Sequence, residues 1–219
     1  MHEKALQPAA ADAETIRRPR WRRWAVVPWG TFLLEMASIV ASVLLALWVS
    51  DWNEHRKDVA RADEAIAGIR RELHDNRIRL GTSSEYYSQL VATMDSLRSS
   101  PSPEAPERFT QLPGWRGLQP PLITDDVFSA ALSTQVLGPI DFNLVATLSQ
   151  TYGALRQCRA LHDRFLTDIY EGRVSDLTSF RGRLRDLVSM SDGVGRTVSA
   201  AVAVLDARAH PDGAPTAQP

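Results

Sequence analysis

The longest apolar stretch of the chain lies near its amino terminus, over residues 25–50. A helix that crosses the roughly 30 Å hydrocarbon core of a bilayer needs about 20 residues, because each residue adds about 1.5 Å. Five of the six tryptophans fall between positions 21 and 52. Trp29 and Trp48 would lie roughly 28 Å apart on such a helix, which is the spacing of two interfacial aromatic belts. The pattern predicts a single transmembrane helix over residues 25–50.

After this segment, apolar side chains recur at alternating spacings of three and four residues, which predicts one long heptad-patterned helix over residues 51–100. The seam positions are Val59, Ala62, Ile66, Ile69, Leu73, Asn76, Leu80, Ser83, Tyr87, Leu90, Met94 and Leu97. The polar seam residues Asn76 and Ser83 either set the register or mark looser packing. Gly81 leaves a kink or break open, because glycine costs about 1 kcal/mol relative to alanine in a helix. Such a seam needs a partner, which is either a second copy of the chain or a later helix that folds back.

Six prolines between positions 101 and 121 predict a linker over residues 101–123 that turns the chain around, since a regular helix does not tolerate them. Residues 124–209 then predict a helical hairpin or bundle, beginning with a short helix for which Thr124 is the expected N-cap. The next helix is expected to begin near Asp141 and to loosen at Gly172.

The segment Ser191–Gly195 predicts a turn before a last short helix, because it contains two glycines close together. No strand-like alternation of useful length occurs. We therefore predict an all-α fold, in which the transmembrane helix continues into the long helix. That helix is expected to pack in an antiparallel helical bundle.

Charges beside the apolar segment predict its orientation. Five arginines lie between positions 17 and 23, whereas Arg56, Lys57 and Arg61 follow the segment. The positive-inside rule makes residues 1–24 a cytoplasmic basic tail and places the later domain outside the cytoplasm. No small-x-small cleavage site follows the apolar run, so we expect an uncleaved signal anchor. Residues 210–219, rich in proline, glycine and alanine, are expected to form a disordered tail.

Glu35 is the one acidic residue of the predicted span, and on a helical wheel it shares a face with Ser38, Ser42 and Ala46. Small residues at this spacing let membrane helices approach closely, and an acidic group at membrane depth favours a partner. Three interpretations remain open. Glu35 reaches toward the cytoplasm and the small residues are incidental, the face is an interface within an oligomer, or Glu35 marks a proton or ion pathway.

Composition and motifs give little sign of chemistry. The formal net charge of −1 over 219 residues argues against bulk nucleic-acid binding. Cys158 is the only cysteine, so an intrachain disulfide is excluded, and Cys158 with His162 provides two potential metal ligands where a site needs more. No nucleophile elbow, phosphate loop, zinc-protease motif or dinucleotide fingerprint occurs. We predict no catalytic residue, no cofactor and no metal site, and hence a protein that is not an enzyme.

Two tryptophans stand out as contact candidates. Trp52 belongs to the motif Asp51-Trp52-Asn53-Glu54 directly after the span, where it fits an interfacial anchor. Asn53 and Glu54 either contact lipid headgroups or a neighbouring protein, or the motif serves anchoring alone. Trp115, among the prolines of the linker, either packs on the bundle or forms a docking point for a partner.

An ordered set of features carries a resemblance: Glu35, the apolar run Met36–Ser50, Asp51-Trp52-Asn53-Glu54, Arg56-Lys57 and a charged helix through Leu73. This order resembles a bacterial family of single-pass membrane proteins known as a domain of unknown function. Residues 136–144 with Tyr152 are similar, more loosely, to a second recurring block of that family, with Ser133-Thr134 in place of its Ser-Gly pair. The resemblance implies a bacterial envelope protein with no assigned activity. Together with the orientation given by the flanking charges, it predicts a protein of the bacterial inner membrane with a periplasmic domain. It carries no catalytic residues.

These features predict a non-enzymatic interaction or scaffold protein that acts through helix–helix association. Its expected partners are the lipid bilayer and either a second copy or another membrane protein. The alternative is a ligand-sensing ectodomain that signals through a separate membrane partner, since residues 1–15 are too short to hold an output domain.

Overall fold

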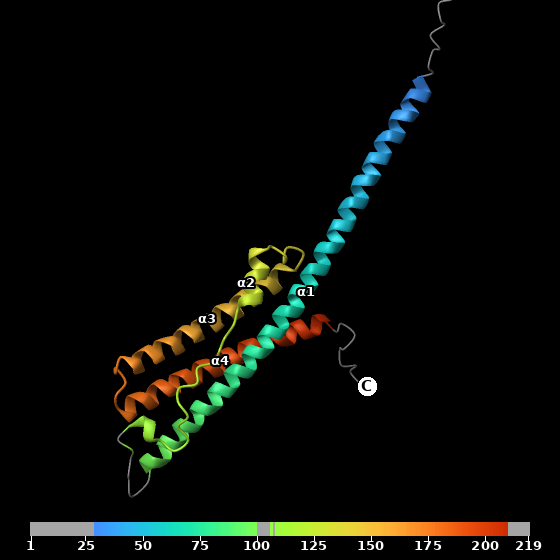
Figure 1. The fold of residues 1–219 in the computed structure, drawn as a ribbon. Helices are drawn as coiled ribbons and strands as arrows, with labels where there is room; N and C mark the ends of the chain where they lie inside the picture. The colour runs from blue at the N-terminus through green and yellow to red at the C-terminus, as the bar shows by residue number, and fades with distance from the viewer. Residues whose placement is uncertain (1–28, 100–105, 107, 210–219) are drawn as a thin grey trace, which may run out of the picture. The chain divides into compact units, whose positions relative to one another are not determined.

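A computed structural model describes residues 29–99, 106 and 108–209 of the chain (Figure 1). This part contains four α-helices, one short 3-10 helix and no strand, which confirms the all-α class. The elements are α1 (Trp29–Ser99), η1 (Phe109–Gln111), α2 (Asp126–Ser133), α3 (Phe142–Tyr170) and α4 (Leu177–Ala209). The predicted tails, residues 1–24 and 210–219, lie outside the described residues, as do the first four residues of the predicted span.

The chain divides into two compact units, residues 1–50 and 51–219, and α1 contributes to both. Helix α1 is continuous from Trp29 to Ser99, so the predicted continuation of the apolar segment into the long helix is confirmed. It also has no break at Gly81. In the first unit the large apolar side chains of α1 are all exposed. Among the described residues, α1 is the only helix whose length and composition suit a membrane crossing.

In the second unit, α1 turns its heptad seam inward. The seam is buried from Ala62 to Met94, whereas Val59 is 36% exposed and lies beyond the core. Of the two partners that the pattern left open, the structure uses later helices of the same chain. The side chains that cover the seam from α3 and α4 include Leu148, Leu155, Phe165, Phe180, Leu184, Val198 and Leu205.

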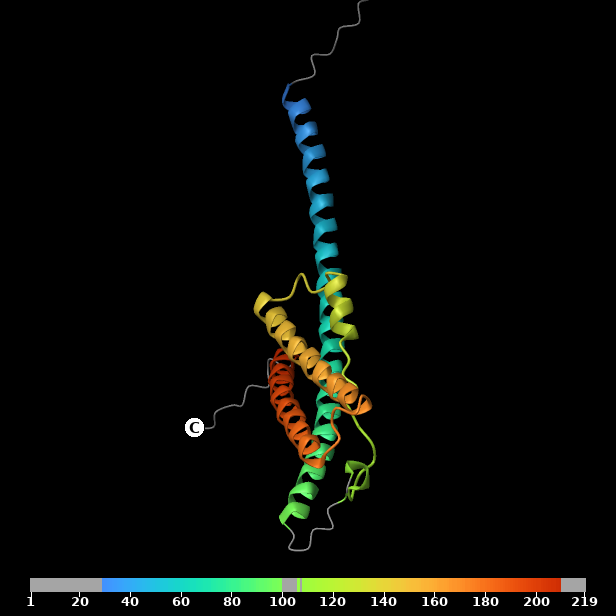
Figure 2. The same cartoon turned by 90° about the vertical axis from the view of Figure 1, so that its left-hand side faces the viewer.

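The two apolar clusters of the second unit show in which direction α3 and α4 run relative to α1. One cluster joins Ile69 of α1 with the amino-terminal half of α3 and the carboxyl-terminal half of α4. The other joins Leu90 of α1 with Phe165 of α3 and Phe180 near the start of α4. Helix α3 therefore runs in the same direction as α1, and α4 runs antiparallel to both (Figures 1 and 2).

An extended segment, residues 116–124, accounts for this arrangement by returning along α1 before α2 begins, and we call it the strap. Its backbone is held by the polar seam residues. Asn76 donates from Nδ2 to the carbonyl of Thr124 at 2.7 Å and accepts at Oδ1 from the Thr124 N–H at 3.0 Å. Ser83 Oγ donates to the carbonyl of Gln119 at 2.7 Å. Because buried backbone groups need partners, these two residues satisfy the strap where apolar seam residues would not.

Three further side chains of α1 extend this pattern. The hydroxyl of Tyr87 accepts from the N–H of Gln119 at 2.9 Å. The hydroxyl of Tyr86 donates to the carbonyl of Gly117 and accepts from the N–H of Arg116, both at 2.9 Å. Arg79 reaches the carbonyl of Leu122, also on the strap. Helix α1 thus recognises the strap through main-chain atoms at five of its nine residues.

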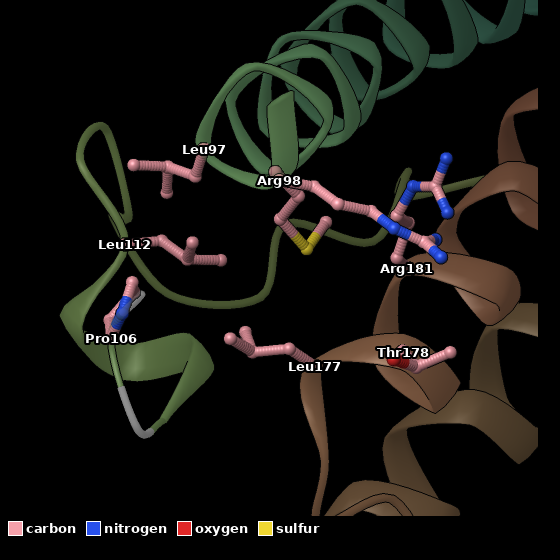
Figure 3. Close-up of a pocket in the computed structure, with 8 residues that line it drawn as sticks. Leu97, Arg98, Pro106, Leu112, Leu177, Thr178 and Arg181 are labelled. Atoms are coloured by element: carbon pink, nitrogen blue, oxygen red, sulfur yellow. The ribbon is translucent and has the colours of Figure 1, made fainter. Parts of the chain in front are cut away.

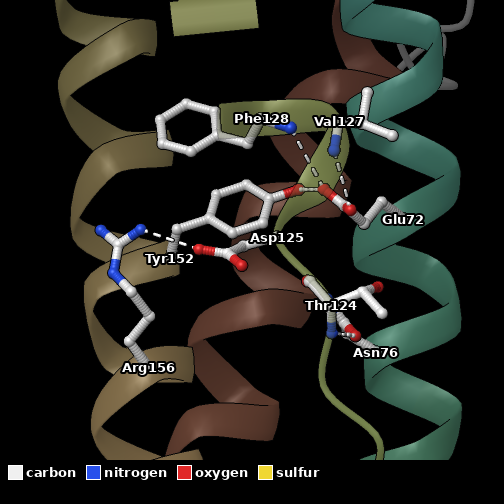
Figure 4. A network of polar contacts seen from close by, with 8 residues as sticks. All are labelled: Glu72, Asn76, Thr124, Asp125, Val127, Phe128, Tyr152 and Arg156. Carbon is white, nitrogen blue, oxygen red and sulfur yellow. Dashed lines mark hydrogen bonds and ion pairs between the residues drawn. The ribbon is translucent and has the colours of Figure 1, made fainter. Parts of the chain in front are cut away.

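Helix α2 is capped from another helix (Figure 4). Its N-cap residue is Asp125, one position after the predicted Thr124, and Asp125 makes no side-chain capping bond. The carboxylate of Glu72 on α1 instead accepts from the N–H groups of Val127 at 3.1 Å and Phe128 at 3.3 Å. A carboxylate at this position satisfies two unpaired donors of the first turn and complements the helix dipole.

The end of α3 is sharper than predicted. Gly172 has φ +71°, and its N–H donates to the carbonyl of Ile169 while that of Arg173 donates to the carbonyl of Asp168. This pair of bonds is a Schellman motif, which requires a left-handed residue that glycine adopts without strain. Glycine therefore separates α3 from α4 outright, where the sequence predicted a loosened single helix.

The predicted turn at Ser191–Gly195 is wrong, because α4 continues without interruption from Leu177 to Ala209. The buried residues Leu187, Ser191, Val194 and Val198 step by three and four through this segment and pack inward. Burial of this stripe outweighs the helix cost of two glycines, about 1 kcal/mol each.

Candidate functional site

A cavity of about 350 Å³ lies between the carboxyl-terminal end of α1 and the amino-terminal end of α4 (Figure 3). Its volume falls in the range of small-molecule sites in proteins. The residues that line it are Met94, Leu97, Arg98, Pro106, Leu112, Leu177, Thr178 and Arg181. They come from α1, the linker and α4, so no single sequence segment supplies the cavity.

The apolar wall of the cavity continues the core of the second unit. Met94 and Leu97 are the last seam positions of α1, and Leu112 is buried where the linker folds over them. Leu177 is the first residue of α4 and is half-buried. None of the lining residues belongs to α3.

The opposite side of the cavity is cationic. Arg98 extends from α1 and Arg181 from α4, with the hydroxyl-bearing Thr178 one turn before Arg181 (Figure 3). The amino terminus of α4 adds the positive end of its dipole. No carboxylate of the described residues pairs with Arg98.

Asp95 balances part of this charge. Its carboxylate forms an ion pair with Arg181 and accepts from Arg185 at 2.8 Å. Burial alone would raise the pKa of Asp95, but hydrogen bonds and charges from Arg185 and Arg181 hold it below its usual value. Asp176 is occupied elsewhere, because its carboxylate accepts from the N–H of Ser179 at 2.8 Å in the first turn of α4. Among the described residues around the cavity, the arginines therefore outnumber the acidic groups.

Aromatic rings belong to the same apolar cluster as Met94 and Leu112 of the cavity wall. Phe109 stacks on Phe180 with centroids 4.4 Å apart, and Trp115 meets Phe180 edge-on at 5.8 Å. Trp115 is half-buried in this cluster. The structure thus gives Trp115 a packing role, and a partner contact at its exposed part stays a prediction.

The residues predicted for the membrane segment all lie on α1 in the first unit. Trp29, Glu35, Ser38, Ser42, Ala46 and Trp48 are exposed. Ser42 Oγ donates to the carbonyl of Ser38 at 2.7 Å, so this hydroxyl is satisfied within its own helix. The interface and ion-pathway interpretations of this face stay predictions.

The motif after the span is exposed as well. The guanidinium carbon of Arg56 lies 5.0 Å from the ring centroid of Trp52, a cation–π arrangement on the surface of α1. Asn53 and Glu54 are exposed. Their contact with lipid headgroups or a neighbour stays a prediction.

Cys158 and His162 share one face of α3, but the site is buried and closed. His162 Nδ1 lies 2.9 Å from the carbonyl oxygen of Cys158, and the Cys158 sulfur lies 3.8 Å from Ser191 Oγ. Burial raises the pKa of the Cys158 thiol and lowers that of the His162 imidazole. Within the described ranges, no three His, Cys, Asp or Glu side chains gather as a metal site would require. This pair is a packed polar contact within the core.

Sequence reasoning missed Arg98, Arg181 and the cavity between them. They lie 83 positions apart, and each resembles an ordinary surface arginine of a helix. Only the antiparallel placement of α4 against α1 brings them together. Neither a protein-family model, nor a curated protein, nor a solved structure matches this chain.

Proposed function

We propose that this protein is a single-pass protein of the bacterial inner membrane, with its amino terminus in the cytoplasm and residues 51–209 in the periplasm. In this proposal it acts through helix–helix association rather than catalysis. The arginines at positions 17–23 support the orientation. The resemblance of residues 35–80 to a bacterial family of single-pass membrane proteins supports the compartment.

One contrast carries the proposal. The second unit covers its own heptad seam, whereas the apolar residues of α1 in the first unit have no cover from the described chain. Leu34, at 71% exposure, and Leu44, at 60%, are typical of this surface. Continuous exposed apolar surface of more than a few hundred Å² marks a membrane or partner contact. A lipid bilayer with a second helix in it satisfies both the length and the composition of this segment.

The small-residue face supports association within the bilayer. Ser38, Ser42 and Ala46 let a second helix approach closely, and the Ser42 hydroxyl is already bonded to its own backbone. Closely packed helices would also give Glu35 a partner at membrane depth. Because α3 and α4 cover the heptad seam, the small-residue face is the surface through which two copies would associate.

Membrane insertion is tested by extraction with alkaline carbonate and by reporters fused after residue 209. We expect the full chain to stay in the pellet, an alkaline phosphatase fusion to be active, and a cytoplasmic-only reporter to be inactive. Full-length protein in the supernatant, or the opposite reporter pattern, would contradict the proposal.

Association is tested by crosslinking in native membranes with two matched variants. Ser42→Leu places a bulky side chain on the small-residue face, whereas Val43→Leu changes a neighbouring lipid-facing position. We expect Ser42→Leu to lower the crosslinked fraction several-fold and Val43→Leu to leave it unchanged. If crosslinking of the wild type gave only monomers, and no membrane protein copurified, the association proposal would be refuted.

A second candidate function is ligand sensing that is passed on to a separate membrane partner. The cavity at the α1–α4 end favours it, because it combines apolar walls with two arginines. A ligand bound there contacts α1 directly, and α1 also carries the apolar segment of the first unit.

A further inference from the structure

We infer that the cavity between α1 and α4 binds an anionic amphiphile, namely a carboxylate on an unbranched alkyl chain of about eight carbons. This inference deepens the second candidate function and rests on it. It is independent of association in the membrane.

Volume sets the size of the ligand. A water molecule occupies about 30 Å³ in the liquid, so a cavity of about 350 Å³ holds roughly a dozen non-hydrogen atoms. An eight-carbon carboxylate has about ten such atoms and fills this space with little strain. A full-length phospholipid chain pair would exceed it.

The lining sets the polarity of the ligand. Five of the eight lining side chains are apolar: Met94, Leu97, Pro106, Leu112 and Leu177. In Figure 3 Leu97, Pro106, Leu112 and Leu177 lie on one side, away from the guanidinium groups of Arg98 and Arg181. A molecule with an alkyl body and a charged head matches this division, since each part meets its own kind of surface.

Two features of the lining arginines set the sign of the head group. The Arg181 side chain is only 20% exposed, and its Nε is buried without a hydrogen-bond acceptor among the described residues. Arg98 brings a second guanidinium to the same cavity. Asp95 offsets part of the charge of Arg181 and Arg185, and Arg98 has no carboxylate partner among the described residues, so a net positive charge faces the cavity. It favours an anion, and guanidinium groups match a carboxylate in geometry as well as charge.

Binding is measured by isothermal titration of the full chain in lipid nanodiscs, with empty nanodiscs as the reference for partitioning. The probes are octanoate, hexanoate, acetate, octanol and octyltrimethylammonium. We expect saturable binding of octanoate and roughly fifteenfold weaker binding of hexanoate, since each of the two missing methylenes contributes about fourfold. Acetate, octanol and octyltrimethylammonium should give no saturable heat.

Three variants locate the site. Arg98→Gln removes one charge from an exposed side chain and should lower octanoate affinity at least tenfold. Leu177→Trp fills the cavity and should abolish binding. Arg159→Gln, at an exposed arginine of α3, is the matched control and should bind as the wild type does. Unchanged thermal unfolding of the unliganded variants confirms that each is folded.

Equal binding of octanol and octanoate would overturn the inference, because it would show apolar adsorption without charge recognition. Unchanged octanoate affinity in Arg98→Gln would do the same, as would folded wild-type protein that takes up no octanoate. A carbonate-resistant, crosslinked protein without octanoate binding refutes this inference alone. Octanoate binding by a protein that does not associate refutes only the association proposal.

Discussion

The hydroxyl of Tyr152 on α3 donates a hydrogen bond to the carboxylate of Glu72 on α1, with 2.6 Å between the two oxygens. The same carboxylate accepts from the first-turn N–H groups of Val127 and Phe128 on α2 (Figure 4). Burial, followed by the bond to Glu72, raises the pKa of Tyr152 well above its ordinary value, so the phenol stays a donor. One buried carboxylate therefore joins three helices.

Replacement of Glu72 by glutamine should destabilise the second unit by about 2–3 kcal/mol, because the new amide group places a donor against donors. Tyr152→Phe should cost only about 1 kcal/mol, since it removes one bond and keeps the ring stack on Phe128 at 4.3 Å. Urea unfolding of the full chain in detergent, followed by circular dichroism, measures both. Equal losses would contradict a central role for the carboxylate.

Asn76→Leu should loosen the strap and lower stability by about 2–4 kcal/mol, because the N–H and the carbonyl of Thr124 both lose their buried partner. Urea unfolding reports the stability, and limited proteolysis reports cleavage within residues 116–124. Ile78→Ala is the control on the same helix, since Ile78 is 53% exposed and its loss should change stability by less than about 0.5 kcal/mol. Similar cleavage of both variants would show that Asn76 does not hold the strap.

The stability of the second unit should decrease as the pH falls from 7.5 to 5.5. Burial lowers the pKa of His162 below the 6.5 of a free imidazole, so the unfolded chain binds a proton at a pH where the folded chain does not. Its Nε2 has no hydrogen-bond partner among the described residues, and the Cys158 carbonyl and the charge of Asp163 offset only part of the cost of burying the charged form. The stability that the neutral His162 contributes is fully present above pH 6.5, and it is lost as the pH falls toward the pKa of His162 in the folded protein.

Urea midpoints at several pH values between 5.5 and 7.5 measure this effect. His162→Gln should flatten the profile relative to the wild type. His74→Gln, at an exposed histidine of α1, should leave the slope unchanged. A wild-type profile without slope would contradict the buried neutral imidazole.

The Cys158 thiol should resist alkylation in the folded protein. Its side chain is fully buried, and burial raises its pKa, so little reactive thiolate forms at neutral pH. Treatment with iodoacetamide at pH 8 should modify it only after denaturation, as mass spectrometry will show. Rapid modification of the native chain would mean that α3 and α4 separate readily at Ser191.

The sequence predicted the elements whose signals are local and repeated. The seam from Ala62 to Met94 is visible as a period, and the prolines after it exclude a regular helix. The apolar segment of residues 25–50 is also visible in the sequence as a largely apolar run. These patterns also placed Tyr87 on the buried face of α1, where the structure has it.

The same reasoning failed where distant residues decide the outcome. The glycines at 193 and 195 indicate a turn by themselves, but the stripe through Val194 packs against other helices and keeps α4 intact. Asn76 and Ser83 were recognised as unusual, yet their role depends on a strap more than thirty residues away. The cavity has no local signature, since Arg98 and Arg181 meet only after α4 has folded back.

Side chains of α1 form hydrogen bonds with main-chain amide and carbonyl groups of the strap, from Arg116 to Thr124. An exposed side chain such as Leu122 is therefore exchangeable, whereas the number of residues between the two ends is fixed. Deleting a single residue between Gln119 and Leu122 would shift one half of the strap against its partners and pull α2 away from Glu72. At the exposed positions of the strap many residue types fit, but buried Ile123 and the length of the segment are fixed.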